Sequence, residues 1–220
     1  MTRIKLCGLT REEDVATANE LQPDYVGFVF WPRSRRCVSP ETARLLKAQL
    51  DTRIAAVGVF VDAPADQVAG LLDDGTIDIA QLHGHEDDAY IAAVRSLLPE
   101  PAQKVLVKAF VVKDAADLHA ASQSSADMVL LDAGLGGGTP FDWSLLEQFE
   151  RPYFLAGGLD ADNVAEALAL TGAAAVDTSS GIETDGVKDP AKMRAFVQAV
   201  RAWDAENRQA SQSTYTRSRA

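Results

Sequence analysis

The chain has 220 residues, of which 47% are hydrophobic and 24% charged, so it can form one full core and is not a disordered chain. Its formal charge of −11 argues against general nucleic-acid binding, which depends on neutralising phosphates. Two cysteines are too few for a disulfide-rich secreted scaffold, and the apolar runs are too short to cross a membrane. We therefore expect a cytoplasmic globular protein with no nucleic-acid or membrane partner.

Short apolar segments recur along the chain at intervals of about 25 residues. Several of them are nearly continuous apolar runs, which is typical of strands buried on both faces of a parallel sheet. The eight candidate strands are Arg3–Cys7, Asp24–Phe30, Arg53–Phe60, Asp78–Leu82, Lys104–Ala109, Asp127–Leu131, Pro152–Leu155 and Ala174–Asp177.

Helical patterns lie between these strands, and the first two begin with capping signals. Thr10 followed by Glu13 predicts a capping box. Ser39 before Pro40 predicts a capping hydroxyl ahead of a proline in the first turn. Four helices are predicted: 11–21, one that starts at residue 40, 160–170 and 189–203. Leu45, Leu46 and Leu50 are expected to form the apolar face of the second.

Strands that alternate with helices must pair in parallel, with helices covering the sheet. Eight such units in about 200 residues predict an α/β protein with a single (β/α)₈ barrel. An open doubly wound sheet is the alternative, but the chain has no Gly-x-Gly-x-x-Gly motif after its first strand. We expect the barrel to occupy residues 1–204, followed by a polar, disordered tail over 205–220.

Functional residues of such a barrel lie where the strands end at their C-terminal side. Cys7 ends the first strand, and the nearby Lys5 and helix start would favour its thiolate. Asp132 follows the sixth strand, where partial desolvation would raise the pKa of its carboxyl and suit it to act as an acid. A thiol and a carboxyl on different strands can move protons at two atoms of one substrate. The structural alternatives are a cysteine that only packs and an aspartate that only caps a turn.

Two neighbouring strand ends carry small residues suited to binding phosphate. Gly157-Gly158 follows the seventh strand, and Ser179-Ser180-Gly181 follows the eighth. Glycines let backbone N–H groups approach an anion, and barrels often bind phosphate at these two loops. Residues 136–139, after the sixth strand, are expected to close over the same region. A tight turn and a helix cap are the structural alternatives.

The loop over residues 31–36 contains three arginines in an otherwise acidic protein, which predicts a second anionic group on the ligand. His83 is either a general base or a polar wall of the pocket. Cys37 is expected to be incidental, since a disulfide with Cys7 is disfavoured in the cytoplasm. No His, Cys and Asp cluster has metal-ligand spacing, so we expect no metal.

Taken together, these motifs resemble the phosphoribosylanthranilate isomerase family of tryptophan biosynthesis, from Lys5 to about Phe196. The motifs that carry the resemblance are Lys5-Leu6-Cys7-Gly8-Leu9-Thr10, Gly27-Phe28-Val29-Phe30, Ser34-Arg35-Arg36, Val57-Gly58-Val59-Phe60, Gln81-Leu82-His83-Gly84, Leu131-Asp132, 136–143, Gly157-Gly158-Leu159, 177–183 and Gly186-Val187-Lys188-Asp189.

The resemblance implies a cofactor-free monomer or homodimer that carries out an Amadori rearrangement. Its substrate is N-(5-phosphoribosyl)anthranilate and its product 1-(2-carboxyphenylamino)-1-deoxyribulose 5-phosphate. It implies that Cys7 is the general base, that Asp132 is the general acid and that Arg36 holds the anthranilate carboxylate. The residues expected to bind substrate are Arg36, Gln81, His83, Gly157, Gly158, Asp177, Ser179, Ser180 and Gly181.

The sequence leaves alternatives open for some site residues and for the function. Leu135 and Pro140 stand where the family's loop after the sixth strand often has a glycine and a small polar residue, so which glycine of 136–138 contacts phosphate is open. Arg35 stands beside Arg36 and could exchange roles with it. Another phosphosugar barrel, such as an epimerase or an indole-forming synthase, would need a metal cluster or several strand-end Lys and Glu residues; Lys108 is the one such lysine to watch. A non-catalytic sensor of phosphorylated ligands would tolerate the loss of Cys7 and Asp132.

Overall fold

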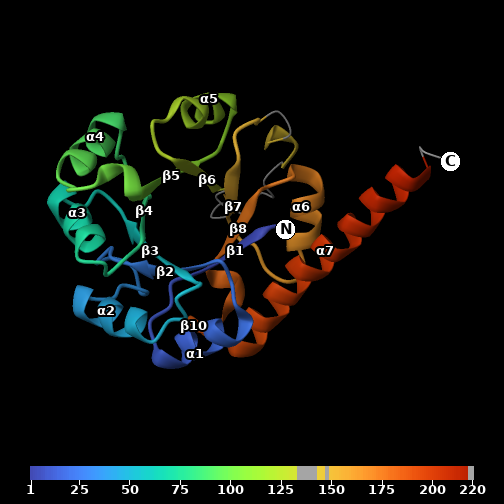
Figure 1. Cartoon of the computed structure of the whole chain (residues 1–220), viewed down its shortest axis with the longest axis horizontal. Coiled ribbons are helices and arrows are strands. Elements are labelled where there is room, and N and C mark those ends of the chain that lie inside the picture. The colour runs from blue at the N-terminus through green and yellow to red at the C-terminus, as the bar shows by residue number, and fades with distance from the viewer. Residues whose placement is uncertain (133–142, 147–148, 218–220) are drawn as a thin grey trace.

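The computed structural model describes residues 1–132, 143–146 and 149–217, and within these ranges eight parallel strands close into a barrel (Figure 1). Each strand pairs with the next in chain order, and the barrel closes where β1 pairs with β8, with Lys5 opposite Asp177. The predicted (β/α)₈ barrel is confirmed, and the open doubly wound sheet is excluded. The strands are β1 Arg3–Cys7, β2 Tyr25–Val29, β3 Ala55–Phe60, β4 Ile79–Leu82, β5 Val105–Val111, β6 Met128–Asp132, β7 Tyr153–Ala156 and β8 Ala175–Thr178.

Several strands begin later than predicted, and for three of them the residue expected to come first is an aspartate just outside the strand. Asp24, Asp78 and Asp127 each precede a strand and accept a hydrogen bond from a backbone N–H of the neighbouring strand. The donors are Ile4, Ala56 and Leu106, each at 2.8 Å. The carboxylates therefore pair backbone groups at the N-terminal end of the barrel that would otherwise lack partners.

Helices surround the barrel (Figure 1), and the four whose starts were predicted, α1, α2, α6 and α7, begin within four residues of those positions. The described α-helices are α1 Glu12–Leu21, α2 Pro40–Ala48, α3 Ala65–Asp73, α4 Asp88–Ser96, α5 Ala115–Gln123, α6 Val164–Thr171 and α7 Pro190–Arg217, with 3₁₀ turns η1 Pro101–Gln103, η2 Trp143–Leu146 and η3 Ser180–Ile182 and a hairpin of β9 Glu183–Thr184 with β10 Val187–Lys188.

The N-cap predicted for α2 is confirmed, and the N-cap predicted for α1 is wrong. Ser39 accepts from the backbone N–H of Thr42 at 3.1 Å, as predicted for α2. The cap predicted at Thr10 is wrong: the N-cap of α1 is Arg11, and Asp14 accepts from the N–H groups of Thr10 and Arg11 at 3.0 Å each. An acidic residue three positions after the N-cap closes the box, and Asp14 stands at that position.

Two layers of apolar side chains form the core. One lies inside the barrel and includes Tyr25, Val57 and Phe154, and the other lies between the strands and the helices. Because side chains alternate along a strand, the same strands supply both layers. Leu45, predicted to face the core from α2, is exposed, since only Ala43 and Leu46 of that helix are buried.

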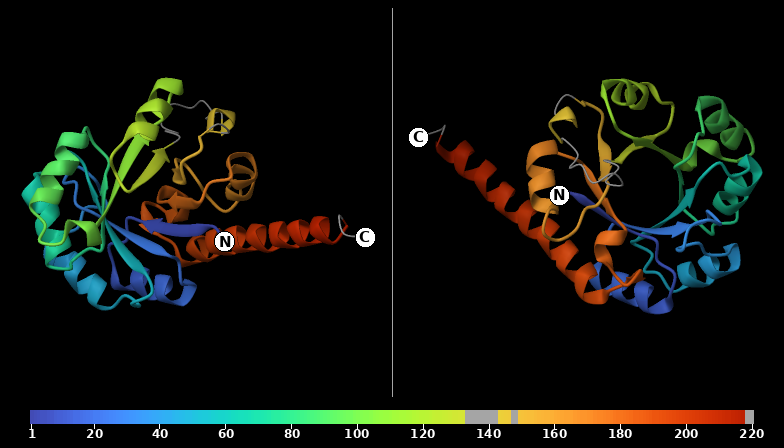
Figure 2. Two further views of the ribbon diagram at one scale, coloured as in Figure 1. Left: turned by 45° about the horizontal axis from the view of Figure 1, so that its top comes forward. Right: turned by 180° about the vertical axis from the view of Figure 1, so that it is seen from behind.

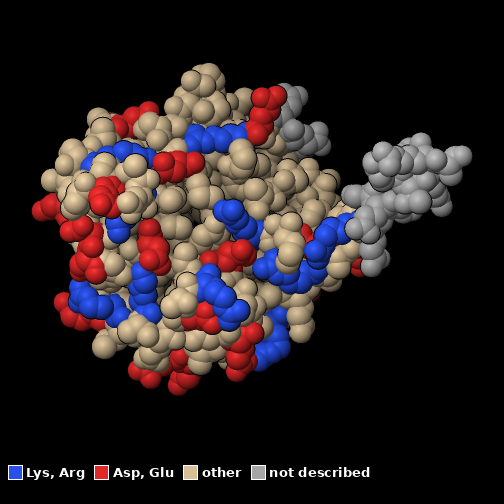
Figure 3. Space-filling view, viewed as in Figure 1, with Lys and Arg blue, Asp and Glu red and all other residues tan. Residues whose placement is uncertain are grey.

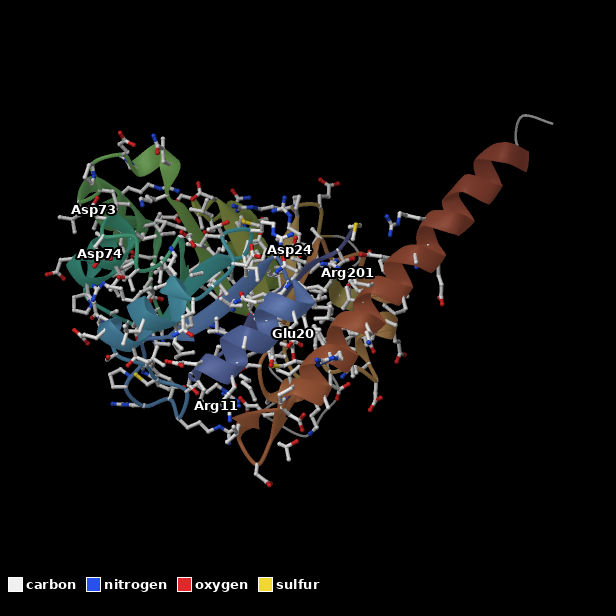
Figure 4. All side chains as sticks on the ribbon, turned by 60° about the horizontal axis from the view of Figure 1, so that its bottom comes forward. Arg11, Glu20, Asp24, Asp73, Asp74 and Arg201 are labelled. Atoms are coloured by element: carbon white, nitrogen blue, oxygen red, sulfur yellow. The ribbon has the colours of Figure 1, made fainter. Side chains whose placement is uncertain are left out.

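Helix α7 packs against α1 and α6 and extends beyond the barrel (Figures 1 and 2). Figure 4 shows α1 and α7 lying side by side, where Arg194 pairs with Glu20 and Arg201 with Asp24. Residues 205–217, for which we expected a disordered tail, continue this helix. The segment contains neither glycine nor proline, so nothing in it stops the helix. The domain boundary at residue 204 stays a prediction.

On the face shown in Figure 3, acidic and basic side chains are interspersed. In the described part of the chain, we find no helix that is both long and apolar enough to span a membrane.

Candidate functional site

A cavity of about 490 Å³ lies at the C-terminal ends of the strands. It brings together every predicted site residue except Gly181. Its lining residues are Cys7, Val29, Arg36, Val59, Gln81, His83, Asp132, Ala156, Gly157, Gly158, Asp177, Ser179 and Ser180.

Cys7 is the last residue of β1, and its thiol is buried beside Val29 and Val59. The neighbouring strand makes room for it at Gly27, where a Cβ atom would lie 2.7 Å from the Cys7 sulfur. Burial raises the pKa of the Cys7 thiol above its ordinary value, although the nearby Lys5 opposes this shift. The expectation that Lys5 would leave the thiolate favoured is therefore wrong, because desolvation outweighs the attraction of the cation.

Lys5 forms a buried ion pair with Asp177 across the seam between β1 and β8. The Lys5 Nζ lies 2.8 Å from Asp177 Oδ2, and the two side chains are 1% and 8% exposed. Burial alone would lower the pKa of Lys5, but Asp177 and Cys7 together raise it. Burial raises the pKa of Asp177, against the effect of Lys5. Among the described residues Asp177 Oδ1 has no hydrogen-bond partner, so one oxygen of this carboxylate can accept a bond from a ligand.

Asp132 ends β6 and lies beside a short chain of polar side chains from β4 and the loop after it. His83 Nε2 is 3.3 Å from Asp132 Oδ2, and His83 Nδ1 is 3.1 Å from Gln81 Nε2. The His83 and Asp132 side chains are 27% and 23% exposed, so this part of the site is in contact with solvent. His83 is therefore placed to orient the carboxyl group of Asp132.

Arg36 is held by a carboxylate that the sequence reasoning did not assign. Its Nε and Nη2 donate to the two oxygens of Glu183 at 2.6 and 2.8 Å. This hydrogen-bonded contact raises the pKa of Arg36. Arg35 contacts the same carboxylate at 2.6 Å but its side chain is 60% exposed and does not line the cavity. The geometry thus favours Arg36 over Arg35 for a group bound in the cavity.

The loops after β7 and β8 meet at one side of the cavity. Gly157 and Gly158 have φ angles of 101° and 63°, a left-handed conformation that glycine adopts without strain. Ser179 donates to the carbonyl of Cys7 at 3.1 Å, which ties the β8 loop to β1. Gly181 packs closely against the carbonyl of Leu159, which leaves no room for a side chain, and its predicted contact with phosphate stays a prediction.

Other predicted features lie apart from the cavity or outside the described residues. Cys37 is exposed, and both cysteines are free. Lys108 is buried and donates to the carbonyl of Gly84 at 2.7 Å, in a neighbouring cavity that contains neither Cys7 nor Asp132. Residues 136–139, with Leu135 and Pro140, lie outside the described residues. Within the described ranges no group of three or more His, Cys, Asp or Glu is placed to hold a metal ion.

At the sequence level no partner was assigned to three charged residues near the cavity: Lys5, which pairs with Asp177, Glu183, which pairs with Arg36, and Lys188, which pairs with Glu183. A lysine between two buried residues of an apolar strand, Ile4 and Leu6, is a signal for Lys5, because a buried cation needs a buried partner. The contact of Glu183 with Arg36 joins distant loops, which sequence spacing does not show, whereas Lys188 pairs with Glu183 across the short β9–β10 hairpin.

Known proteins are similar to this chain over most of its length. Residues 4–199 match the family model described as N-(5'-phosphoribosyl)anthranilate (PRA) isomerase. The N-(5'-phosphoribosyl)anthranilate isomerase of Endomicrobium trichonymphae is 44% identical over 207 residues, which cover 92% of this chain and 100% of that protein.

Solved structures of the same name are also similar. A phosphoribosyl anthranilate isomerase in complex with reduced 1-(o-carboxyphenylamino)-1-deoxyribulose 5-phosphate is 32% identical with a TM-score of 0.80, and the match covers 92% of this chain and 100% of that chain. Monomers generated from the dimeric isomerase of Thermotoga maritima are 32% identical with a TM-score of 0.79, over 91% and 99% of the two chains. This chain therefore belongs to the N-(5'-phosphoribosyl)anthranilate isomerase family.

Proposed function

We propose that this chain converts N-(5'-phosphoribosyl)anthranilate to 1-(2-carboxyphenylamino)-1-deoxyribulose 5-phosphate in tryptophan biosynthesis, with Cys7 as general base and Asp132 as general acid. One observation carries the assignment of the two groups: a thiol from β1 and a carboxyl from β6 line the same cavity. The family and the ligand of the related structure support the reaction.

The two anionic ends of this substrate have matching surfaces in the cavity. Gly157, Gly158, Ser179 and Ser180 form the side suited to phosphate, since backbone N–H groups of glycine-rich loops bind oxyanions. Arg36 is suited to the anthranilate carboxylate, because a guanidinium binds carboxylates through paired hydrogen bonds. A substrate held at both ends would lie across the cavity, within reach of the Cys7 and Asp132 side chains that line it.

In the first step, Asp132 would protonate the furanose ring oxygen and open the ring to an iminium ion. This step requires the protonated carboxyl, and His83 Nε2 at 3.3 Å orients it. The partial exposure of Asp132 gives it access to solvent, so it can regain its proton between turnovers.

In the second step, Cys7 would take the proton from C2 of the sugar, a carbon made acidic by the adjacent iminium. The resulting enolamine then tautomerises to the ketone, as C1 gains a proton and the C2 hydroxyl loses one. Cys7 returns its proton to solvent before the next turnover, which balances the proton that Asp132 regains. Burial raises the pKa of Cys7, which makes its thiolate a stronger base, while Lys5 limits the shift. Each proton transfer is expected to contribute about 10²–10⁴-fold to the rate.

Asp177 would contribute its second oxygen, Oδ1, on the same side of the cavity, and Gln81 would hold His83 in place. We expect no cofactor for this chemistry. A monomer or homodimer and a cytoplasmic location stay predictions; the related protein from Thermotoga maritima is described as dimeric.

The test is a direct assay of phosphoribosylanthranilate consumption by Cys7→Ser and Asp132→Asn. We expect each substitution to lower kcat by at least about 10²-fold, with a modest change in KM, because each removes a proton transfer and leaves the binding surfaces in place. Cys37→Ser is the matched control, since this thiol is exposed and outside the cavity, and it should retain full activity.

Full activity of both variants would overturn the acid–base assignment. A chain that binds the substrate tightly but never turns it over, with or without the two groups, would instead be a sensor of phosphorylated ligands.

A further inference from the structure

Glu183, the first residue of β9, is a buried carboxylate that contacts three cations. Its oxygens lie 2.6 Å from Arg36 Nε, 2.6 Å from Arg35 Nη2 and 2.7 Å from Lys188 Nζ, and its side chain is 4% exposed. Burial opposes ionisation, but the hydrogen bonds from Arg36 and Lys188 hold the pKa of Glu183 at about 2. The carboxylate is therefore charged throughout the neutral range, and the three cations leave the group positive overall.

The contact with Glu183 uses one edge of the Arg36 guanidinium. The carboxylate occupies Nε and one proton of Nη2. A guanidinium has five N–H donors in a fixed plane, and no described residue accepts from the edge formed by Nη1 and the second Nη2 proton, so this edge is suited to another carboxylate. The stem of Arg36 is also confined, since a Cβ atom at Gly8 would lie 2.5 Å from its Cδ. Glu183 thus fixes the plane in which Arg36 presents its second edge.

Lys188 connects the same carboxylate to the β8 loop. Its Nζ donates to Glu183 Oε1 at 2.7 Å and to the carbonyl of Ser179 at 2.8 Å. Ser179 lines the cavity and also donates to the carbonyl of Cys7. One carboxylate is therefore linked to the arginine end of the cavity directly and to the phosphate end through a single lysine.

The hairpin that carries Glu183 and Lys188 is fixed from two sides. Lys192 of α7 donates to the carbonyl of Glu183 at 2.7 Å, and Arg11 donates to the carbonyl of Lys188 at 2.8 Å. Figure 4 labels Arg11 at the start of α1, next to the beginning of α7. Because residues at both flanking helices bind its backbone, the hairpin can hold the side chains of Glu183 and Lys188 in fixed positions.

We propose that Glu183 is a positioning residue that sets the orientation of Arg36 and, through Lys188, the position of the β8 loop, so that the two anion-binding ends of the cavity are held at a fixed separation. The inference rests on the proposed role of Arg36 in binding the substrate carboxylate. It adds that neither end reaches its binding geometry without the buried carboxylate between them.

The test compares Glu183→Gln with Arg36→Ala and Arg35→Ala in steady-state kinetics with phosphoribosylanthranilate. We expect Arg36→Ala and Glu183→Gln each to raise KM by about tenfold or more, with a smaller change in kcat. The double variant should resemble Arg36→Ala alone, because the two residues act through one contact. Arg35→Ala, which removes an exposed contact to the same carboxylate, should change KM by less than about threefold.

Inhibition by inorganic phosphate provides a second readout, for the other end of the cavity. Glu183→Gln should weaken this inhibition because Lys188 loses its charged partner, whereas Arg36→Ala should leave it unchanged. If Glu183→Gln does not fold, as judged by its circular dichroism, Glu183→Asp replaces it. Its carboxylate is one methylene too short to keep all three contacts, so we expect the same two effects.

The outcomes separate this inference from the proposed function. If Arg36→Ala leaves KM unchanged, the assignment of Arg36 fails, and the inference built on it fails with it. If Arg36→Ala raises KM while folded Glu183→Gln alters neither KM nor phosphate inhibition, Glu183 is only structural and the positioning role is overturned, although the proposed function stands.

Discussion

The two sides of the cavity place their reactive groups in opposite environments. On the side of β1 and β8, Cys7 stands beside a lysine–aspartate pair that is almost completely buried. On the side of β4 and β6, Asp132 and His83 face each other while keeping about a quarter of their surface exposed. The base is thus surrounded by fixed buried charges, and the acid by a partner in contact with water.

This difference fits the two tasks. Burial raises the pKa of Cys7, which makes its thiolate a stronger base, and Lys5 opposes the shift, which keeps more of the thiol ionised. An acid that must be reprotonated in each cycle gains from contact with solvent. The comparison teaches that the two sides should respond differently to mutation: substitutions on the buried side can lower both stability and rate, whereas substitutions on the exposed side should lower the rate with little effect on stability.

The largest effect is expected from Lys5→Met, which breaks the buried pair and leaves Asp177 without its cation. The free energy of unfolding should fall by about 3–5 kcal/mol, because an uncompensated buried charge is costly. Urea denaturation measures the change. Lys47→Met is the control: its pair with Asp78 is more exposed and should contribute no more than about 1 kcal/mol.

The same variant should also alter the pH profile. Lys5 lowers the pKa of Cys7, so its loss should move the rise of kcat/KM toward higher pH. A loss of stability no larger than that of Lys47→Met would show that the pair is not buried in solution.

Gly27→Ala tests how closely β2 confines the thiol. The added methyl carbon would lie 2.7 Å from the Cys7 sulfur, so the thiol must move. We expect kcat to fall by about 10²-fold, since displacement of a reacting group by about 1 Å has such effects. Gly70→Ala on α3 is the matched control, because nothing lies within 4 Å of its added carbon. It should keep full activity; equal activity of both variants would contradict the close contact.

A smaller effect is expected from His83→Gln on the exposed side. It removes the imidazole beside Asp132 without leaving a buried charge unpaired, so stability should change by less than about 1 kcal/mol. The rate should fall by about tenfold, or 1.4 kcal/mol, as the carboxyl loses its orienting partner. Steady-state kinetics and urea denaturation measure the two quantities. A loss of stability comparable to that of Lys5→Met would remove the contrast between the two sides.

The barrel was predictable because its signals are local: apolar runs about 25 residues apart and capping residues such as Ser39 at the start of a helix. The residues that line the cavity could also be predicted, because the C-terminal ends of the parallel strands in a barrel meet at one mouth. Properties that depend on surroundings were harder to predict. The pKa of Cys7 is set by how much water the packed barrel excludes, which the adjacent Lys5 in the sequence does not reveal.

Contacts between distant loops also could not be predicted from the sequence. Glu183 pairs with Arg36, which is 147 residues away in the sequence, and no periodicity links them. Gly181 was assigned to a phosphate loop by its position, which stays a prediction; its close packing against the backbone at Leu159 is a contact that the sequence does not show. The extension of α7 was missed because a polar composition was taken as disorder, although the segment contains no helix-breaking residue.

The ion pair of Lys5 with Asp177 joins residues 172 positions apart, on the first and last strands of the barrel. The charge environment of the thiol is therefore assembled only when the two ends of the fold meet. A growing chain that has not yet made β8 already contains Cys7 and Asp132, but it lacks the carboxylate that neutralises Lys5. Closure of the barrel therefore also completes the charge environment of the thiol.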